Sequence, residues 1–282
     1  MTRSGFLSLL AWVVAMNLAT GLEAQMPLSV ATYNIRYDNP KDTIKWSERT
    51  QEVANAVRYN DIVGLQEVLP NQWADLRPLF PFHDSYGVGR DADGGGEACP
   101  IFYDRERFDF LHGEVRWLAE SDWALPGKIG WDADLPRIAT IVLLYDRKSG
   151  KQVRIFNVHL SHVGELARAG ALGLLSGWAG HPEDDAIHVL LGDFNMTAET
   201  VEIQEMIERT EFKDVYTSAA FRCRQHYGTY TTFLPERAVL AERIDHIFVR
   251  GATVEWTCAE EVIKYGLFVS DHMPVHAELS LE

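Results

Sequence analysis

The sequence contains few cysteines and no cysteine pattern that is typical of a metal site. Cys99, Cys223 and Cys258 are the three cysteines, and no Cys-x-x-Cys pair or cysteine–histidine cluster occurs. Three cysteines are too few for the disulfide framework of a small secreted domain, and the missing clusters argue against structural zinc. One bridge, for example between Cys223 and Cys258, is permitted in an oxidising compartment but is not required by the sequence.

Basic residues are also scarce. The chain has 26 lysines and arginines against 41 aspartates and glutamates, which gives a formal net charge of −15. A protein that coats nucleic-acid phosphates is normally basic, so this composition disfavours a broad electrostatic interface of that kind. An anionic substrate must therefore be met locally, by a metal ion or by a few arginines.

The chain lacks an apolar run that is long enough to span a membrane. The run from Phe6 to Ala19 is shorter than the roughly 20 residues that a membrane-spanning helix needs. It follows Arg3, and a stretch of small residues after it ends at Ala24, which is the pattern of a cleavable signal peptide. We therefore expect a signal peptide over residues 1–24, a periplasmic or secreted protein and no stable membrane span.

No internal repeat, low-complexity tract or linker divides the rest of the sequence, so we expect one domain over residues 25–282, acting as a monomer. Hairpins alternate with helices, which predicts a layered α/β fold of two mixed, mostly antiparallel sheets packed face to face, with a doubly wound parallel sheet as the alternative. The predicted helices are 46–58, 72–79, 165–178 and 199–209. The predicted strands are 28–33, 61–68, 99–103, 108–118, 138–145, 152–159, 187–191, 229–233, 243–249 and 275–281.

A carboxylate and a carboxamide follow one of these strands directly. The apolar run that ends at Leu191 breaks at Gly192 and is followed by Asp193 and Asn195. In an extended chain, side chains two positions apart project to the same side, so these two groups leave the strand end together. Such a pair suits a hard cation, a water molecule or an anionic oxygen, although an ordinary turn would use the same residue types.

Five further strand ends decide between a turn and a site, because each also carries polar groups of compatible chemistry. Ligand sites favour rims where such side chains converge, and so many polar strand ends are hard to explain as solvated caps. The groups are Asn34, Glu67, His159 with His162, Asp245, and Asp271 with His272. We therefore expect them to form one site together with Asp193 and Asn195.

Seven sequence blocks, in order along the chain, resemble the endonuclease/exonuclease/phosphatase superfamily. They read TYNIRYD, DIVGLQEV, GEACPIFYDRERF, FNVHLSH, LLGDFN, RIDHIFV and SDHMPV. The superfamily includes pancreatic deoxyribonuclease, abasic-site endonucleases, deadenylases, inositol polyphosphate phosphatases and secreted sphingomyelinases, and its secreted bacterial branch has blocks similar to GVGRDADG and GWDADLPRI. The resemblance implies a four-layered α/β/β/α sandwich and metal-dependent hydrolysis of a phosphate ester.

The resemblance also implies roles for the strand-end residues. Glu67 resembles the main ligand of the divalent metal, with Asn34 beside it and Asp271 as a second carboxylate on the metal side. Asp193 resembles the carboxylate that orients the attacking water, and Asn195 resembles the amide that holds a phosphoryl oxygen. Hard oxygen ligands fit Mg²⁺ or Mn²⁺, which can neutralise the charge that repels an incoming hydroxide.

Two histidines complete the implied site. His272 resembles the histidine that contacts phosphate or acts as a base, and Asp245 resembles the carboxylate that orients it. His159 matches a histidine on the opposite side, which deoxyribonuclease-like members pair with a glutamate, and Glu97 is the candidate partner here. A carboxylate beside a histidine raises its basicity and fixes its tautomer, as an acid–base role requires.

Three cationic or titratable side chains near these blocks are candidates for binding substrate. Arg36 lies in the loop where abasic-site enzymes carry an acid, so we expect it to contact substrate phosphate. Arg137 follows a polar insertion and could supply a local positive charge. His162 follows His159 by three positions, but the branch often has an aspartate where this chain has Ser161, which weakens a role for His162.

The sequence thus predicts an exported Mg²⁺- or Mn²⁺-dependent enzyme that hydrolyses a phosphodiester or phosphomonoester by direct attack of an activated water. Small or carbohydrate-linked phosphates are the expected substrates. Alternatives are a secreted nuclease acting on DNA or RNA, a sphingomyelinase-like lipid phosphodiesterase, and a non-catalytic binding module on the same fold. The complete set of polar strand ends argues against the binding module, and the net charge disfavours the nuclease.

Overall fold

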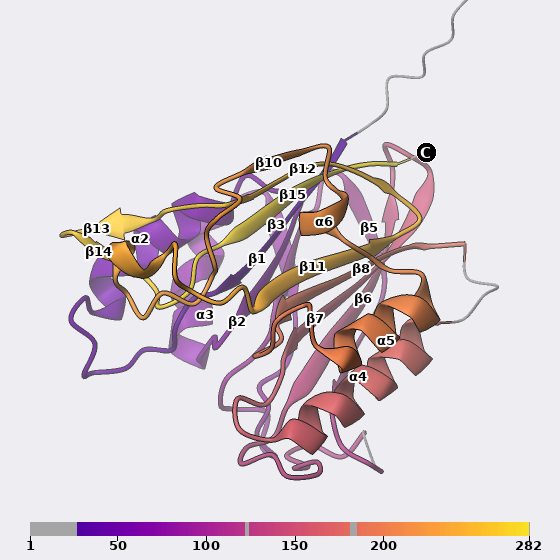
Figure 1. Ribbon diagram of the computed structural model, residues 1–282, viewed down its shortest axis with the longest axis horizontal. Helices are drawn as coiled ribbons and strands as arrows, with labels where there is room; N and C mark the ends of the chain where they lie inside the picture. Colours follow the sequence, from indigo (N-terminus) through magenta and orange to yellow (C-terminus); the bar gives the residue numbers. More distant parts are fainter. Residues whose placement is uncertain (1–26, 122–123, 181–184, 282) are drawn as a thin grey trace, which may run out of the picture.

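Two sheets of mixed strand direction pack face to face in the computed structural model, which describes residues 27–121, 124–180 and 185–281 (Figure 1). The expected signal peptide lies outside these residues. No helix in the described ranges is both long and apolar enough to cross a membrane.

The first sheet has seven strands, of which only the pairs β1–β2 and β10–β12 are parallel. In spatial order its strands are β10 (Phe221–Cys223), β12 (Thr253–Ala259), β15 (Val275–Ser280), β1 (Pro27–Asn34), β2 (Ile62–Gln66), β4 (Ile101–Asp104) and β3 (His83–Tyr86).

The second sheet has six strands, and only the pair β7–β8 is parallel. In spatial order its strands are β5 (Phe108–Trp117), β6 (Ile138–Asp146), β7 (Lys151–His159), β8 (Ile187–Asp193), β11 (Asp245–Arg250) and β9 (Lys213–Asp214). A separate two-stranded ribbon consists of β13 (Ile263–Lys264) and β14 (Leu267–Phe268).

Helices cover the outer face of each sheet (Figure 1). On the first sheet, Val53 and Val57 of α2 (Trp46–Val57) pack with Tyr33 of β1, and α3 (Pro70–Leu76) contributes to the same core. On the second sheet, α4 (Glu165–Ala179) and α5 (Val201–Thr210) cover β7 and β8. The short elements are α6 (Val215–Ser218) and two 3₁₀ turns, η1 (Arg77–Leu79) and η2 (Pro235–Arg237).

A third apolar core fills the space between the two sheets. Val30 of β1 and Ile62 of β2 pack there with Val189 and Leu191 of β8, whereas Tyr33 of β1 faces the helices. Adjacent strand residues point to opposite faces, so one central strand supplies two cores and reads as a continuous apolar run. The order of layers is therefore α/β/β/α, as predicted, and the doubly wound alternative is wrong.

One predicted strand is wrong. Residues 229–233 are irregular, apart from an isolated bridge between Tyr230 and His272. Thr232 and Phe233 have φ angles of 55° and 70°, so the chain turns here where an extended conformation was expected. The β-branched and aromatic composition of this segment favoured a strand, but its residues instead serve a loop that crosses the site.

The structure also shows which cysteines form a disulfide. Cys223 of β10 and Cys258 of β12 are direct neighbours in the parallel register, with their Cα atoms 4.9 Å apart, and they form a disulfide. Cys99 is buried and free.

Candidate active site

Strand register brings three of the predicted residues into one row. His159, the last residue of β7, pairs with Asp193, the last residue of β8. Asp193 in turn pairs with Asp245, the first residue of β11. Neighbouring strands are about 4.8 Å apart, so this register alone places the three side chains within reach of one another.

The first sheet supplies the facing residues, and Asn34 connects the two sheets. Asn34 ends β1, and its Nδ2 donates to Oε1 of Glu67 at 3.0 Å and to Oδ2 of Asp193 at 2.9 Å. The other carboxylate oxygen of Glu67 accepts from the backbone N–H of Tyr37 at 3.0 Å. One buried amide therefore fixes two carboxylates that come from different sheets.

The backbone turns sharply at the two strand exits. Glu67, which follows β2, has a φ of 61°, and Asn195, two residues after Asp193, has a φ of 51°. Residues other than glycine rarely adopt this left-handed region, although asparagine tolerates it better than glutamate does. Such outliers cluster at functional sites, and both turns here aim a polar side chain into the site. Gly192 has a φ of 144°, and the carbonyl oxygen of Val158 occupies the space that a Cβ would need.

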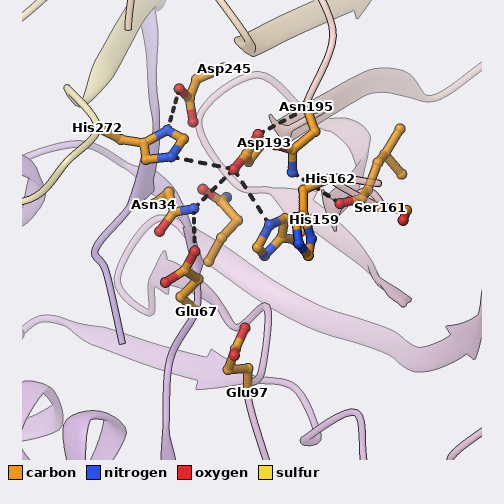
Figure 2. Close-up of polar contacts among 12 residues, drawn as sticks. Asn34, Glu67, Glu97, His159, Ser161, His162, Asp193, Asn195, Asp245 and His272 are labelled. Atoms are coloured by element: carbon orange, nitrogen blue, oxygen red, sulfur yellow. Dashed lines mark hydrogen bonds and ion pairs between the residues drawn. The ribbon is translucent and has the colours of Figure 1, made fainter. Parts of the chain in front are cut away.

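Asp193 lies at the centre of the site (Figure 2). Its Oδ1 accepts from the backbone N–H of Asn195 at 2.9 Å, and its Oδ2 lies 3.5 Å from Nε2 of His159 and 3.6 Å from Nε2 of His272. Only 1% of Asp193 is exposed. Burial raises its pKa to about 7, and the charge of His272 opposes that rise.

The two histidines differ in protonation. Nδ1 of His272 hydrogen-bonds Oδ2 of Asp245 at 2.8 Å, as the predicted orienting role requires. Burial alone would lower the pKa of His272, but Asp245 and Asp193 outweigh it and raise that pKa well above its usual value. Burial, followed by the charge of Arg137, lowers the pKa of His159 well below its usual value. The surroundings therefore favour the protonated form of His272 and the neutral form of His159.

Two sets of side chains could hold a metal ion. Asp193, Asp245 and His272 offer ligand atoms that all lie within 4.8 Å of one another. In this set, however, Nδ1 of His272 is already bonded to Asp245, and Oδ2 of Asp193 accepts a hydrogen bond from Asn34. The other set is Glu67 and Asp271, which offer carboxylate oxygens, with Asn34 beside them, whose Oδ1 accepts from the backbone N–H of Arg36 at 3.0 Å.

The second set fits a divalent cation on its chemistry. Burial raises the pKa of Asp271, His272 opposes this rise, and the negative charge of Glu67 adds to it. A carboxylate whose ionised form is disfavoured by a neighbouring negative charge is stabilised when a cation binds beside it. Mg²⁺ and Mn²⁺ prefer such oxygen ligands.

A cavity of about 660 Å³ opens over these groups. That size is within the range of small-molecule sites. Asn34 and Asp245 are fully buried behind its wall. The other predicted residues line the cavity, and these are Arg36, Glu67, Glu97, Arg137, His159, His162, Asp193, Asn195, Asp271 and His272.

Glu97 does not pair with His159 as expected. Its carboxylate accepts two hydrogen bonds from the guanidinium of Arg90, at 2.9 and 3.0 Å. Figure 2 shows Glu97 apart from the contacts around Asp193. The arginine lies seven residues earlier, across the glycine-rich turn, and a bidentate pair with a guanidinium is a stronger partner for a carboxylate than a histidine.

Arg36 and Asn195 each have a partner within the protein. Arg36 contacts Asp42 at 3.2 Å and Asp271 at 3.5 Å, so its charge lies next to one of the expected metal ligands. Nδ2 of Asn195 donates to the carbonyl of Leu160 at 3.1 Å, which holds the amide in place at the cavity wall.

Sequence reasoning missed six residues that line the cavity: Tyr37, Arg90, Leu135, Tyr230, Glu242 and Ile244. Tyr230 is the most prominent, because 41% of it is exposed and its ring centroid lies 5.1 Å from that of His272. It belongs to the segment that was predicted as a strand. A tyrosine between two threonines gave no signal that could distinguish a site residue from a strand residue.

The sequence matches the Endonuclease/Exonuclease/phosphatase family over residues 31–272. Among solved structures, an endonuclease/exonuclease/phosphatase from Bacteroides vulgatus shares 36% identity at a TM-score of 0.84, over 91% of this chain and 100% of that chain. A family protein from Bacteroides thetaiotaomicron shares 30% at a TM-score of 0.84, over 91% and 98%. A mannosyl-6-phosphatase from the same species shares 31% at a TM-score of 0.81, over 90% and 100%. A comparison with curated proteins found no match.

Proposed function

This chain belongs to the endonuclease/exonuclease/phosphatase family, and from that premise we propose that it hydrolyses a phosphate ester by direct attack of water, assisted by a divalent metal ion. One observation carries the proposal. Asp193 is buried at the junction of the two sheets, where Asn34 fixes it and where Nε2 of His159 and Nε2 of His272 flank the same carboxylate oxygen at 3.5 and 3.6 Å. A buried carboxylate between two histidines, one of which a second carboxylate orients, is an arrangement that acid–base catalysis needs and that a binding module does not.

Each residue of the site has a different role in the proposed reaction. Asp193 orients the attacking water and accepts its proton as the new bond to phosphorus forms and the ester P–O bond breaks. The imidazolium of His272 donates a hydrogen bond to a phosphoryl oxygen, and Asp245 keeps its ring oriented and charged. Asn195 holds a second phosphoryl oxygen. The leaving oxygen takes its proton from solvent.

Glu67, Asn34 and Asp271 would hold the metal ion. When bound, Mg²⁺ or Mn²⁺ would neutralise charge on the phosphoryl oxygens and on the leaving oxygen. The donor set supports this assignment because it consists of hard oxygens, and because the negative charge of Glu67 raises the cost of ionising Asp271, a cost that a bound cation would lower.

A small or carbohydrate-linked phosphate is the substrate class that we propose. The similarity to a mannosyl-6-phosphatase over 90% of this chain supports a sugar phosphate. The net charge of −15 supports a substrate with few phosphates, since a long polyanion would be repelled by most of the surface. The fold alone does not choose among the family's substrates.

A nuclease is the second candidate, because two histidines flank the central carboxylate as the resemblance to deoxyribonucleases implies. The pairing of Glu97 with Arg90 removes one part of that resemblance. Salt distinguishes the two candidates. Cleavage of a polynucleotide that depends on several phosphate contacts falls steeply as salt rises, whereas hydrolysis of a small ester changes little.

A substrate panel tests the proposal. The purified protein, supplied with Mg²⁺ or Mn²⁺, is assayed against sugar phosphates, inositol phosphates, plasmid DNA, RNA and sphingomyelin. We expect the sugar phosphates to be hydrolysed fastest. Faster cleavage of DNA or RNA would favour the nuclease, and no hydrolysis of any ester would contradict the proposal.

We also propose that the protein is exported. Support comes from the signal-peptide pattern of residues 1–24 and from the Cys223–Cys258 disulfide, which is typical of oxidising compartments. N-terminal sequencing of the protein from its native cells tests this. We expect the mature chain to begin near Gln25, and a chain that begins at Met1 would contradict export.

A further inference from the structure

Arg137 has unused hydrogen-bonding capacity beside the site. It immediately precedes β6, only 5% of it is exposed, and it lines the main cavity together with His159 and Asp193. Its Nη2 contacts Nδ1 of His162 at 2.9 Å, but its Nε and Nη1 are buried without a hydrogen-bond partner. A buried guanidinium with unpaired N–H groups is costly, which indicates that a ligand completes its hydrogen bonds.

Among the residues that the structure describes, no carboxylate forms an ion pair with Arg137. Arg90, which lies nearby, is paired with Glu97 through two hydrogen bonds. Arg137 instead donates to a ring nitrogen of His162, and because a guanidinium can only donate, that nitrogen is the acceptor. The other ring nitrogen, Nε2, lies 3.7 Å from Asp134. His162 positions Arg137 without cancelling its charge.

The space beside Arg137 is small. A recess with a volume of about 10 Å³ adjoins the main cavity, and its lining includes Glu67, Arg90, Glu97, Arg137 and His159. This volume is close to the minimum that holds a single water molecule. Arg90 is paired with Glu97, which leaves Arg137 as the cation there that can meet an anionic oxygen. A phosphoryl oxygen would fit there, but the organic substituent that a diester carries in addition would not.

We propose that Arg137, held in position by His162, binds a phosphoryl oxygen that is free in a monoester but esterified in a diester. The site therefore selects terminal phosphate groups, and the enzyme is a phosphomonoesterase by preference. This inference rests on the proposed function and adds to it the substrate class and the residue that selects it.

The test compares two esters with the same leaving group, p-nitrophenyl phosphate and methyl p-nitrophenyl phosphate, which differ by one methyl group and one negative charge. We expect the wild type to have the higher kcat/KM for the monoester. Arg137→Met keeps the length of the side chain but removes its charge, and should lower kcat/KM for the monoester roughly 10- to 100-fold, as expected for hydrogen bonds to a charged group. The same substitution should change kcat/KM for the diester at most about threefold.

Two further variants distinguish the loss of the Arg137 charge from a loss of folding. Arg137→Lys retains the charge and should recover part of the monoester activity, which a merely structural role would not predict. Arg209→Met, at an exposed position of α5, is the matched control and should leave both activities unchanged. Thermal melts of all three variants show whether the fold survives.

Three outcomes would overturn the inference: an equal fall of both activities in Arg137→Met, no fall in either, or a wild-type preference for the diester. Calorimetric binding of inorganic phosphate provides a measurement that does not depend on turnover. If the wild type hydrolyses neither ester, the proposed function fails. The oxygen-binding role of Arg137 then stands if Arg137→Met weakens phosphate binding roughly 10-fold or more, and fails if binding is unchanged.

Discussion

His159 and His272 flank the same oxygen of Asp193 at nearly equal distances, 3.5 and 3.6 Å, yet the protein treats them in opposite ways. Burial lowers the pKa of both rings. On one side Asp245 and Asp193 reverse that effect, whereas on the other side Arg137 and Arg90 add to it. The pKa values of two similarly placed histidines thus shift in opposite directions because of the side chains around them rather than because of their distance to Asp193.

The difference assigns the two sides of the site. On the side of His272 the surroundings favour a protonated ring, which we propose binds the phosphoryl group. On the side of His159 they favour a neutral ring, and this side adjoins Arg137, the group that we infer selects the substrate. Removing the shared carboxylate, or either histidine, should therefore have unequal effects.

Replacing Asp193 should have the largest effect, because both sides depend on it. Asp193→Ala removes the group that accepts the proton of the attacking water and should lower kcat by about 10³-fold, within the usual range for acid–base catalysis. Asp193→Asn has the same shape and should be almost as inactive. Steady-state kinetics checks this, and near-normal turnover in either variant would remove Asp193 from the reaction.

Replacing the two histidines should lower kcat by different amounts. His272→Ala removes a charged donor and should lower kcat at least about 10²-fold, whereas His159→Ala removes a neutral ring and should cost about 10-fold. Circular dichroism confirms that each variant is folded. Equal losses in the two variants would contradict the division of the site into two sides.

The pH profile sharpens the comparison. Asp193 must be ionised to accept a proton, and burial raises its pKa to about 7, so kcat/KM should rise as the pH increases through about 7. At higher pH, kcat/KM should fall as His272 loses its proton. Asp245→Asn removes the largest contribution that raises the pKa of His272, so this falling limb should move to lower pH. A falling limb that does not move would show that Asp245 does not keep His272 charged.

On the side of His272, the sequence predicted the residues at the strand ends but not the loop residue that packs against them. Asn34, Asp193 and His272 could be predicted because each lies at the end of a strand that the local sequence pattern identifies. Paired strands place such ends at one edge of the sheet. It could not find Tyr230, since the segment that carries this residue looks like a strand and is a loop only because of backbone turns at Thr232 and Phe233.

On the side of His159, the sequence did not predict which residues pair with each other. Glu97 was expected to pair with His159, but the competing partner, Arg90, is brought next to it by a turn whose geometry no sequence pattern specifies. Residue type predicts that a carboxylate needs a cation, but not which cation is closest. The Cys223–Cys258 disulfide was left open for the same reason, because it depends on the pairing of β10 with β12.

That disulfide gives the smallest expected effect on activity. It anchors the chain that leads to Thr229, whose Oγ1 accepts from the backbone N–H of Asp245, and to Tyr230, which packs on His272. Cys223→Ser with Cys258→Ser should lower the free energy of unfolding by about 2–4 kcal/mol and change kcat only severalfold. Denaturant unfolding measures the free energy of unfolding, and steady-state kinetics measures kcat. An unchanged free energy of unfolding would show that the disulfide does not stabilise the fold.

Removal of metal tests the central claim most directly. The wild-type protein is treated with EDTA, dialysed, and assayed for hydrolysis of bis-p-nitrophenyl phosphate and p-nitrophenyl phosphate before and after addition of Mg²⁺ or Mn²⁺. We predict that activity on both esters is lost on chelation and restored by either metal, and that Asp193→Ala stays inactive throughout. Hydrolysis that persists in the metal-free protein would contradict a metal-assisted phosphoesterase.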